Sequence, residues 1–149
     1  MKKLDMSDGM QYEEAVRLMN MAHEARKYAY TPYSHFSVGA ALLCKDGTVV
    51  TGCNVENAAY SPGNCAERTA IFKAVSEGKQ KFASIAVVGA KEGGVPDGSS
   101  ICTPCGVCRQ VMGEFCEAKE FRIYVTDGKG VFVYTLDELL PLAFGPAQL

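Results

Sequence analysis

The sequence lacks an excess of charge of either sign, and it lacks any long hydrophobic run. Its 149 residues include 15 Lys and Arg against 17 Asp and Glu, which gives a net charge of −2. Such a balance provides no general attraction to nucleic acid or to an anionic membrane surface. No apolar run approaches the roughly 20 residues that span a bilayer, and the polar N-terminus has no apolar segment typical of a signal peptide. We therefore expect no nucleic-acid partner, no membrane partner and no secretory signal.

Cysteine, in contrast, is plentiful, because the chain has seven of them. An odd count without a secretory signal argues against a disulfide framework and for reduced thiols in a cytoplasmic protein. Cys102 forms a Cys-x-x-Cys pattern with Cys105, which competes with the pattern of Cys105 and Cys108. We favour the second pattern because Pro104 suits a helix start at Cys105. Three further thiols in apolar surroundings are predicted to be core residues, namely Cys44, Cys53 and Cys116.

Two short segments combine residues that can hold a metal. The first is Cys65-Ala66-Glu67, and the second runs from Pro104 through Cys105 to Cys108. A closed structural zinc site usually has four protein ligands, whereas a catalytic site keeps one position for water. A carboxylate beside that position can take a proton from the water and pass it to a substrate. The spacing therefore predicts Zn²⁺ on Cys65, Cys105 and Cys108, with Glu67 as the proton carrier.

Both segments are predicted to begin a helix. Apolar residues recur at helical spacing over 65–78, with Asn64 as the expected N-cap, and again over 105–115. A helix N-terminus favours thiolate over thiol, so two such ends would partly offset the charge of three thiolates. Arg68 and Arg109 directly follow the ligand segments and would offset more of it.

The remaining periodicity predicts one α/β domain over residues 1–149, with residues 1–10 flexible. The order of elements is helix, hairpin, helix, strand, helix, strand, strand and short helix, and the helices are expected to cover both faces of a mixed five-stranded sheet. Residues 91–100 are rich in Gly, Ser and Pro and are predicted to form an exposed loop. The predicted elements are helix 11–30, strands 36–44 and 48–54, strand 84–90, strands 121–126 and 131–135, and helix 136–140.

The two metal segments, in this order, resemble those of the zinc deaminases, which carry a His-or-Cys-x-Glu motif followed by Pro-Cys-x-x-Cys. The resemblance is specifically to small homotetrameric cytidine deaminases that bind zinc with three cysteines. It runs almost from end to end and extends to three further segments, which are Tyr33–Leu42, Gly52–Tyr60 and Leu139–Phe144. The fold that it implies is a three-layer α/β/α sandwich.

The resemblance implies hydrolytic deamination of cytidine and deoxycytidine, in pyrimidine salvage, with one Zn²⁺ per subunit and a nucleoside as the small-molecule partner. Within that family, Glu67 would shuttle the protons and Arg68 would hydrogen-bond the ligand sulfurs. Tyr60 would reach the pocket of a neighbouring subunit in the homotetramer, so that active sites are shared. The other substrate-binding residues that it implies are Phe36 and Phe144 on the pyrimidine, Asn54 and Glu56 on the ribose, and the backbone of Ala66.

Each assignment has an ordinary structural alternative. The cysteines would pack in a core or hold a structural zinc, Glu67 would complement a helix dipole, and the Phe residues would pack. Competing functions are deamination of a polynucleotide or of a cytosine-containing antibiotic, and a non-catalytic zinc-stabilised interaction module. The lack of a basic surplus and the carboxylate of Glu56 oppose a polynucleotide substrate, while the stretch Asn54–Tyr60 fits the cytidine pattern better than an antibiotic. Glu67 beside an incomplete ligand set opposes a purely structural module.

Overall fold

Two long apolar strands form the centre of the sheet. The computed structural model describes residues 1–149 and pairs β2 (Phe36–Cys44) antiparallel with β4 (Phe82–Lys91). The strand order is β1-β6-β5-β4-β2-β3, and only β4 and β5 are parallel neighbours. The other strands are β1 (Lys2–Leu4), β3 (Val49–Cys53), β5 (Arg122–Thr126) and β6 (Val131–Thr135).

The prediction of five strands is wrong, because the N-terminus supplies a sixth. β1 pairs antiparallel with β6, although the sequence predicts flexibility for residues 1–10. Leu4 explains the difference, since it is 2% exposed and packs in the cluster beneath α1. The N-terminal ammonium also pairs with Glu138, and Lys2 pairs with Asp8. One buried side chain within a polar stretch is too weak a pattern to indicate a strand.

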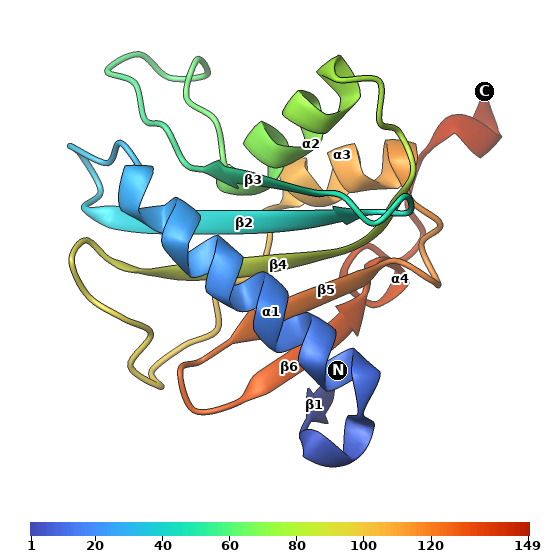
Figure 1. The fold of residues 1–149 in the computed structure, drawn as a ribbon. Coiled ribbons are helices and arrows are strands. Elements are labelled where there is room, and N and C mark those ends of the chain that lie inside the picture. The colour runs from blue at the N-terminus through green and yellow to red at the C-terminus, as the bar shows by residue number, and fades with distance from the viewer.

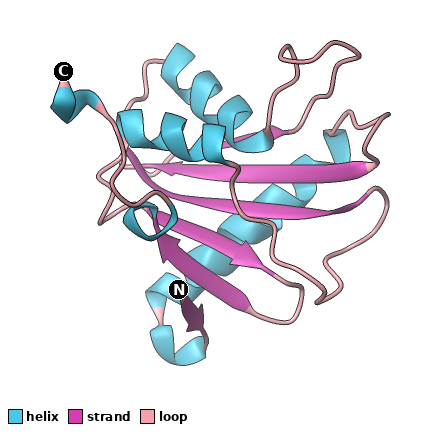
Figure 2. Ribbon diagram, turned by 180° about the vertical axis from the view of Figure 1, so that it is seen from behind, coloured by secondary structure: helices cyan, strands magenta, loops and turns pink.

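Helices cover both faces of the sheet, as predicted, which gives three layers (Figures 1 and 2). α1 (Met10–Ala25) lies on one face, and α2 (Ala66–Ser76) and α3 (Gly106–Phe115) lie on the other. Alternating residues of β4 supply the two cores, because Ile85 and Val87 face α2 and α3 whereas Ala86 and Val88 face α1. The remaining helices are α4 (Leu136–Leu139) and the 3₁₀ turns Met6–Asp8, Arg26–Tyr28 and Pro146–Gln148.

Two glycines let the helices approach the sheet closely. A Cβ at Gly39 would lie 1.9 Å from the carbonyl oxygen of Ala22 on α1. A Cβ at Gly52 would lie 2.5 Å from the carbonyl oxygen of Ala66, at the start of α2. Real side-chain atoms do not occupy such positions, so glycine at these points fixes the depth at which each helix rests. Gly52 thereby sets the position of the α2 N-terminus.

The C-terminal elements follow the prediction closely. Thr135 caps α4 in a capping box, in which Glu138 N donates to Thr135 Oγ1 and Thr135 N donates to Glu138 Oε2.

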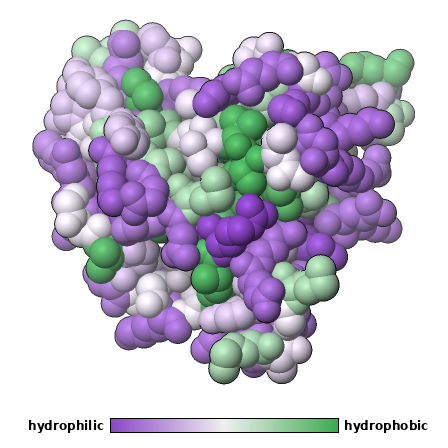
Figure 3. Space-filling model, viewed as in Figure 1, coloured by the Kyte–Doolittle hydropathy of each residue, from purple (hydrophilic) through white to green (hydrophobic).

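Seen from the side of α1, hydrophobic residues gather in a narrow central band with hydrophilic residues on either side (Figure 3). No helix combines the length and the apolar character needed to cross a membrane.

Candidate active site

Cys65 stands at the N-terminus of α2, where it is the N-cap residue. The sequence predicts Asn64 in that role, and the structure corrects this by one position. Asn64 is held in extended backbone because its N–H and carbonyl pair with Val55, and its side-chain amide donates to Thr69. The helix therefore begins one residue later, and the thiol of Cys65 lies where the first free N–H groups of the helix point.

The second thiol segment is arranged in the same way. Cys105 is the N-cap of α3, and Cys108 lies in its first turn and is fully buried. Pro104 precedes the cap instead of opening the first turn, and its side chain is fully buried. Both thiol-bearing segments thus occupy helix N-termini, as the spacing predicts.

The three thiols converge from the two helices. The Sγ atoms of Cys65, Cys105 and Cys108 all lie within 4.8 Å of one another, and those of Cys65 and Cys105 are 3.9 Å apart. Zinc–thiolate bonds of about 2.3 Å in a tetrahedron place sulfur atoms about 3.8 Å apart. The donor set fits a zinc ion with three protein ligands and one further position.

Arg68 lies beside these sulfur atoms. Its Nη2 donates to Cys65 Sγ at 3.5 Å, and its buried Nε has no hydrogen-bond partner within the chain. Hydrogen bonds from Cys108 and Arg68 lower the pKa of Cys65 below that of an ordinary thiol, which favours its thiolate form. A cation that hydrogen-bonds the sulfur atoms stabilises a ligand set that would otherwise be strongly negative.

Glu67 lies one residue into α2 and is only 4% exposed. Burial is the main reason that its pKa rises to about 7, and the charge of Cys65 raises it further. A carboxyl group with a pKa close to neutrality can both accept and release a proton. This combination of burial and position distinguishes Glu67 from a solvated carboxylate that merely complements the helix dipole.

Asn54 and Glu56 both organise the backbone near Phe36. The Asn54 amide accepts from Val38 N at 2.8 Å and donates to the Phe36 carbonyl at 2.9 Å. Glu56 Oε1 accepts from the N–H groups of Tyr33 and Ser34 at 3.0 and 3.1 Å. The sequence does not predict these bonds, which fix both side chains at the start of β2 beside Phe36.

The aromatic candidates lie at or near the surface. Phe36 is 38% exposed, Phe144 60% and Tyr60 101%, while Ala66 is fully buried at the start of α2. The backbone carbonyl of Phe144 accepts from Gln110 on α3. Tyr60 and Phe144 therefore leave most of their ring surface free within a single chain.

Arg109 does not act on the sulfur atoms and is not a solvated helix residue. Its guanidinium donates to the Pro104 carbonyl at 2.7 Å and to the Leu139 carbonyl at 3.0 Å. It therefore ties the start of α3 to the C-terminal segment.

Cys102 is not part of the cluster of three close thiols. Burial, together with the charges of Glu67 and Cys65, raises the pKa of Cys102 to about 11, so it remains a neutral thiol.

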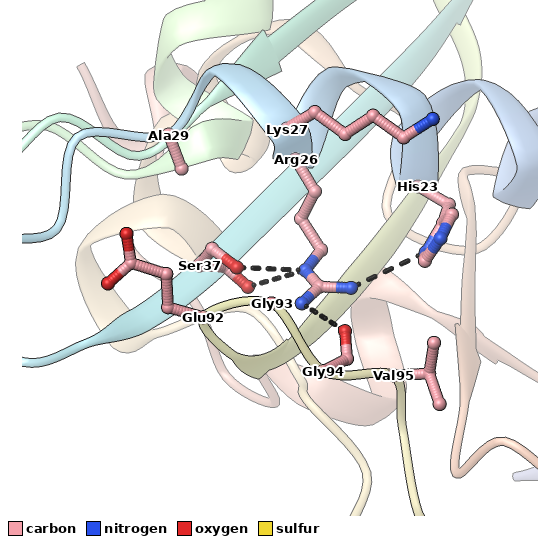
Figure 4. Close-up of a pocket in the computed structure, with 9 residues that line it drawn as sticks. All are labelled: His23, Arg26, Lys27, Ala29, Ser37, Glu92, Gly93, Gly94 and Val95. Atoms are coloured by element: carbon pink, nitrogen blue, oxygen red, sulfur yellow. Dashed lines mark hydrogen bonds between the residues drawn. The ribbon is translucent and has the colours of Figure 1, made fainter.

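Arg26 is a residue whose importance the sequence analysis missed. It is 6% exposed, and it donates to Ser37 and to the carbonyls of Lys91 and Gly94. In Figure 4 its guanidinium extends into a cavity of about 410 Å³ between the end of α1 and the loop that follows β4. Arg26 directly follows α1, four residues after Ala22, so it continues the apolar stripe of that helix, which is the sequence signal for a buried cation.

Three convergent thiols and a buried carboxylate, on a three-layer α/β/α fold, define a catalytic type of zinc site. Residues 12–125 match the family described as the cytidine and deoxycytidylate deaminase zinc-binding region. Because this match covers most of the chain, the protein belongs to the cytidine and deoxycytidylate deaminase family, whose members are zinc-dependent hydrolases that act on C–N bonds.

Several cytidine deaminases are similar in sequence or structure to this chain over most of its length. A cytidine deaminase of Sporosarcina psychrophila is 50% identical over 134 residues, which is 89% of this chain and 93% of the relative. One from Mycobacterium tuberculosis strain H37Rv is 42% identical and covers 86% of this chain and 87% of its own. The crystal structure of cytidine deaminase from Burkholderia pseudomallei has a TM-score of 0.77 and 45% identity, and it covers 87% of this chain and 98% of its own.

Proposed function

We propose that this protein catalyses the hydrolytic deamination of cytidine and deoxycytidine, which releases ammonia and gives uridine and deoxyuridine for pyrimidine salvage. The observation that carries the proposal is the buried carboxyl of Glu67, 4% exposed, two residues from a thiol of the metal cluster. The relatives named cytidine deaminase support the choice of substrate.

Cys65, Cys105 and Cys108 are the residues that would hold the zinc ion. When bound, zinc would act as a Lewis acid that lowers the pKa of a water molecule, so that the water can lose a proton at neutral pH and attack C4 of the pyrimidine. Glu67 would take one proton of that water and deliver it to ring N3. It would then take the remaining hydroxyl proton from the adduct at C4 and pass it to the amine, which leaves as ammonia while the C4 carbonyl forms. Arg68 keeps the sulfur charge partly neutralised throughout, because it donates to Cys65 Sγ.

The substrate would lie over the start of β2. Phe36 and Phe144 present aromatic faces to the pyrimidine, and the backbone at Ala66 hydrogen-bonds the base. Glu56 uses Oε1 for the backbone of Tyr33 and Ser34, so Oε2 is the oxygen offered to a ribose hydroxyl. The Asn54 amide donates one N–H to Phe36 and offers its other N–H to the sugar.

We further propose a cytoplasmic homotetramer in which active sites are shared between subunits. Tyr60 supports the sharing, because its side chain is 101% exposed in a loop that leads to α2 and is free to enter a neighbour's pocket. The seven cysteines, none of which forms a disulfide, support a reducing compartment.

The experiment that tests the function follows the ultraviolet absorbance of cytidine with protein carrying one zinc per chain. We expect conversion to uridine, with turnover reduced at least 10³-fold in Glu67→Gln although zinc content is unchanged. Glu77→Gln, an exposed change at the other end of the same helix, is the matched control and should retain full turnover. Normal turnover in zinc-loaded Glu67→Gln would remove Glu67 from the mechanism. No conversion by the zinc-loaded native protein would exclude cytidine as its substrate.

A further inference from the structure

Gly89 lies on the face of β4 that points towards α2, α3 and the thiol cluster. Its neighbours on that face are Ile85 and Val87, which belong to the core beneath those helices. A Cβ at Gly89 would lie 2.5 Å from Cys102 Sγ, 3.0 Å from Cys102 Cβ and 2.9 Å from Phe36 Cε1. Real Cβ atoms do not come within 3.0 Å of other heavy atoms, so two side chains fill the space that a larger residue at position 89 would need.

These two side chains belong to different parts of the site. Phe36 opens β2, two residues before Val38, which pairs directly with Gly89. Cys102 lies three residues before Cys105, in the segment that leads into α3, and it packs against the same core. Gly89 therefore lies against both the ring of Phe36, proposed as a wall of the substrate pocket, and the side chain of Cys102 in the segment that leads to a zinc ligand.

We propose that Gly89 and Cys102 are positioning residues for the deaminase site. Gly89 leaves the space and the Cys102 side chain fills it, so that the Phe36 ring and the Cys105 segment are held at a fixed separation. Their combined size sets the width of the slot for the pyrimidine ring. This inference rests on the proposed function, because it gives the position of Phe36 a consequence for cytidine binding.

Cys102 acts here through its volume. It does not belong to the cluster in which Cys65, Cys105 and Cys108 lie within 4.8 Å of one another. A thiol is a small and polarisable apolar group that fits a narrow gap between a ring and a backbone. A methyl group added at Gly89 would push the thiol away and press on the Phe36 ring, and because cores are close-packed the displacement would reach Cys105.

The test compares Gly89→Ala, Cys102→Ala and the double variant with the native protein. For each we would measure kcat and KM for cytidine, the rate of zinc release to a chelating dye, and the thermal midpoint. We expect Gly89→Ala to lower kcat/KM about 10- to 100-fold, with a raised KM, and to speed zinc release several-fold. Cys102→Ala in the same chain removes the 2.5 Å contact and empties space into which the added methyl can move away from Phe36 Cε1 at 2.9 Å, so it should recover most of both losses.

Gly113→Ala is the matched control, since a Cβ there would meet only Leu140 Cδ2, at 3.9 Å. It should leave kcat, KM and zinc release unchanged. A purely structural role for Gly89 would lower the thermal midpoint without raising KM. Gly89→Ala with native KM and zinc release would overturn the proposal, as would a double variant no better than Gly89→Ala.

If Gly89→Ala does not fold, Cys102→Leu crowds the same contact from the opposite side. It should show the same loss of kcat/KM and faster zinc release, and native values for both would overturn the proposal. A native protein that does not convert cytidine contradicts the proposed function instead. In that case the zinc-release rates alone decide whether Gly89 and Cys102 position the Cys105 segment.

Discussion

Glu56 holds the backbone before β2, and in the proposed function the same carboxylate also binds the ribose. Its carboxylate accepts two backbone N–H groups in the segment before β2. Hydrogen bonding by Ser34, from the side chain and the backbone, and by the backbone of Tyr33 lowers its pKa. The group is therefore charged at neutral pH, which makes it a stronger acceptor for a sugar hydroxyl than a neutral side chain would be.

Replacing Glu56 by Ala should raise KM for cytidine about 10- to 100-fold, because one charge-assisted hydrogen bond contributes roughly 1.5–3 kcal/mol. Steady-state kinetics with cytidine and with free cytosine would check this, since cytosine lacks the sugar and its KM should change far less. Glu92→Ala, an exposed carboxylate paired with His35, is the control and should alter KM less than twofold. An equal rise in KM for both substrates would rule out the ribose contact.

At the scale of elements, Arg26 joins three segments that are distant in the sequence. From the end of α1, it binds the start of β2 through Ser37, the last residue of β4 through Lys91, and the loop that follows through Gly94. The loop over residues 92–100 is thereby fixed at its beginning, although it has no regular secondary structure. Further along, Pro96 lies against Gly128 in the turn between β5 and β6, where a Cβ would be 2.2 Å from the Pro96 carbonyl oxygen.

Arg26→Met should therefore release this loop and lower the free energy of unfolding by about 2–4 kcal/mol, since the buried carbonyl of Ser37 and the part-buried bonds to Lys91 and Gly94 lose their donor. Hydrogen exchange measured by mass spectrometry should show the greatest loss of protection in the peptide that covers residues 91–100. Arg17→Met, at an exposed position of the same helix, should leave exchange and stability nearly unchanged. Native protection over residues 91–100 in Arg26→Met would contradict the role of Arg26 as the clamp.

At the scale of the whole molecule, the proposed sharing of active sites predicts that two inactive variants can complement each other within one tetramer. Tyr60→Ala and Glu67→Gln should each be nearly inactive alone, because every site then lacks one of the two residues. In randomly mixed tetramers about one quarter of the sites would combine an intact Glu67 with an intact Tyr60 from the neighbour. Refolding the two variants together should restore roughly that fraction of native turnover, as followed by cytidine absorbance.

Two outcomes would contradict sharing. One is a mixture with only the summed residual activities of the two variants, although light scattering shows tetramers. The other is a fully active native monomer. Each variant refolded alone provides the baseline for both comparisons.

The sequence by itself determined what depends on local spacing. Cysteines placed at the beginning of two apolar helical stripes predict two thiol-bearing helix N-termini, and the thiols do converge. The strands over 36–44 and 131–135 and the capping box at Thr135 are also confirmed. These features follow from periodicities of 2 and 3.6 residues and from cap chemistry, which act over a few residues.

Only the tertiary structure decided the contacts between distant segments. Burial of Leu4 makes β1 part of the sheet, and Arg26 donates to the carbonyl of Lys91 at the end of β4. Arg109 donates to the carbonyls of Pro104 and Leu139. The tertiary structure also brought Cys102 and Phe36 together over Gly89. Each of these depends on packing between elements whose relative positions local spacing does not encode. Side-chain volume and unpaired hydrogen-bonding groups select such contacts only when the layers close on one another.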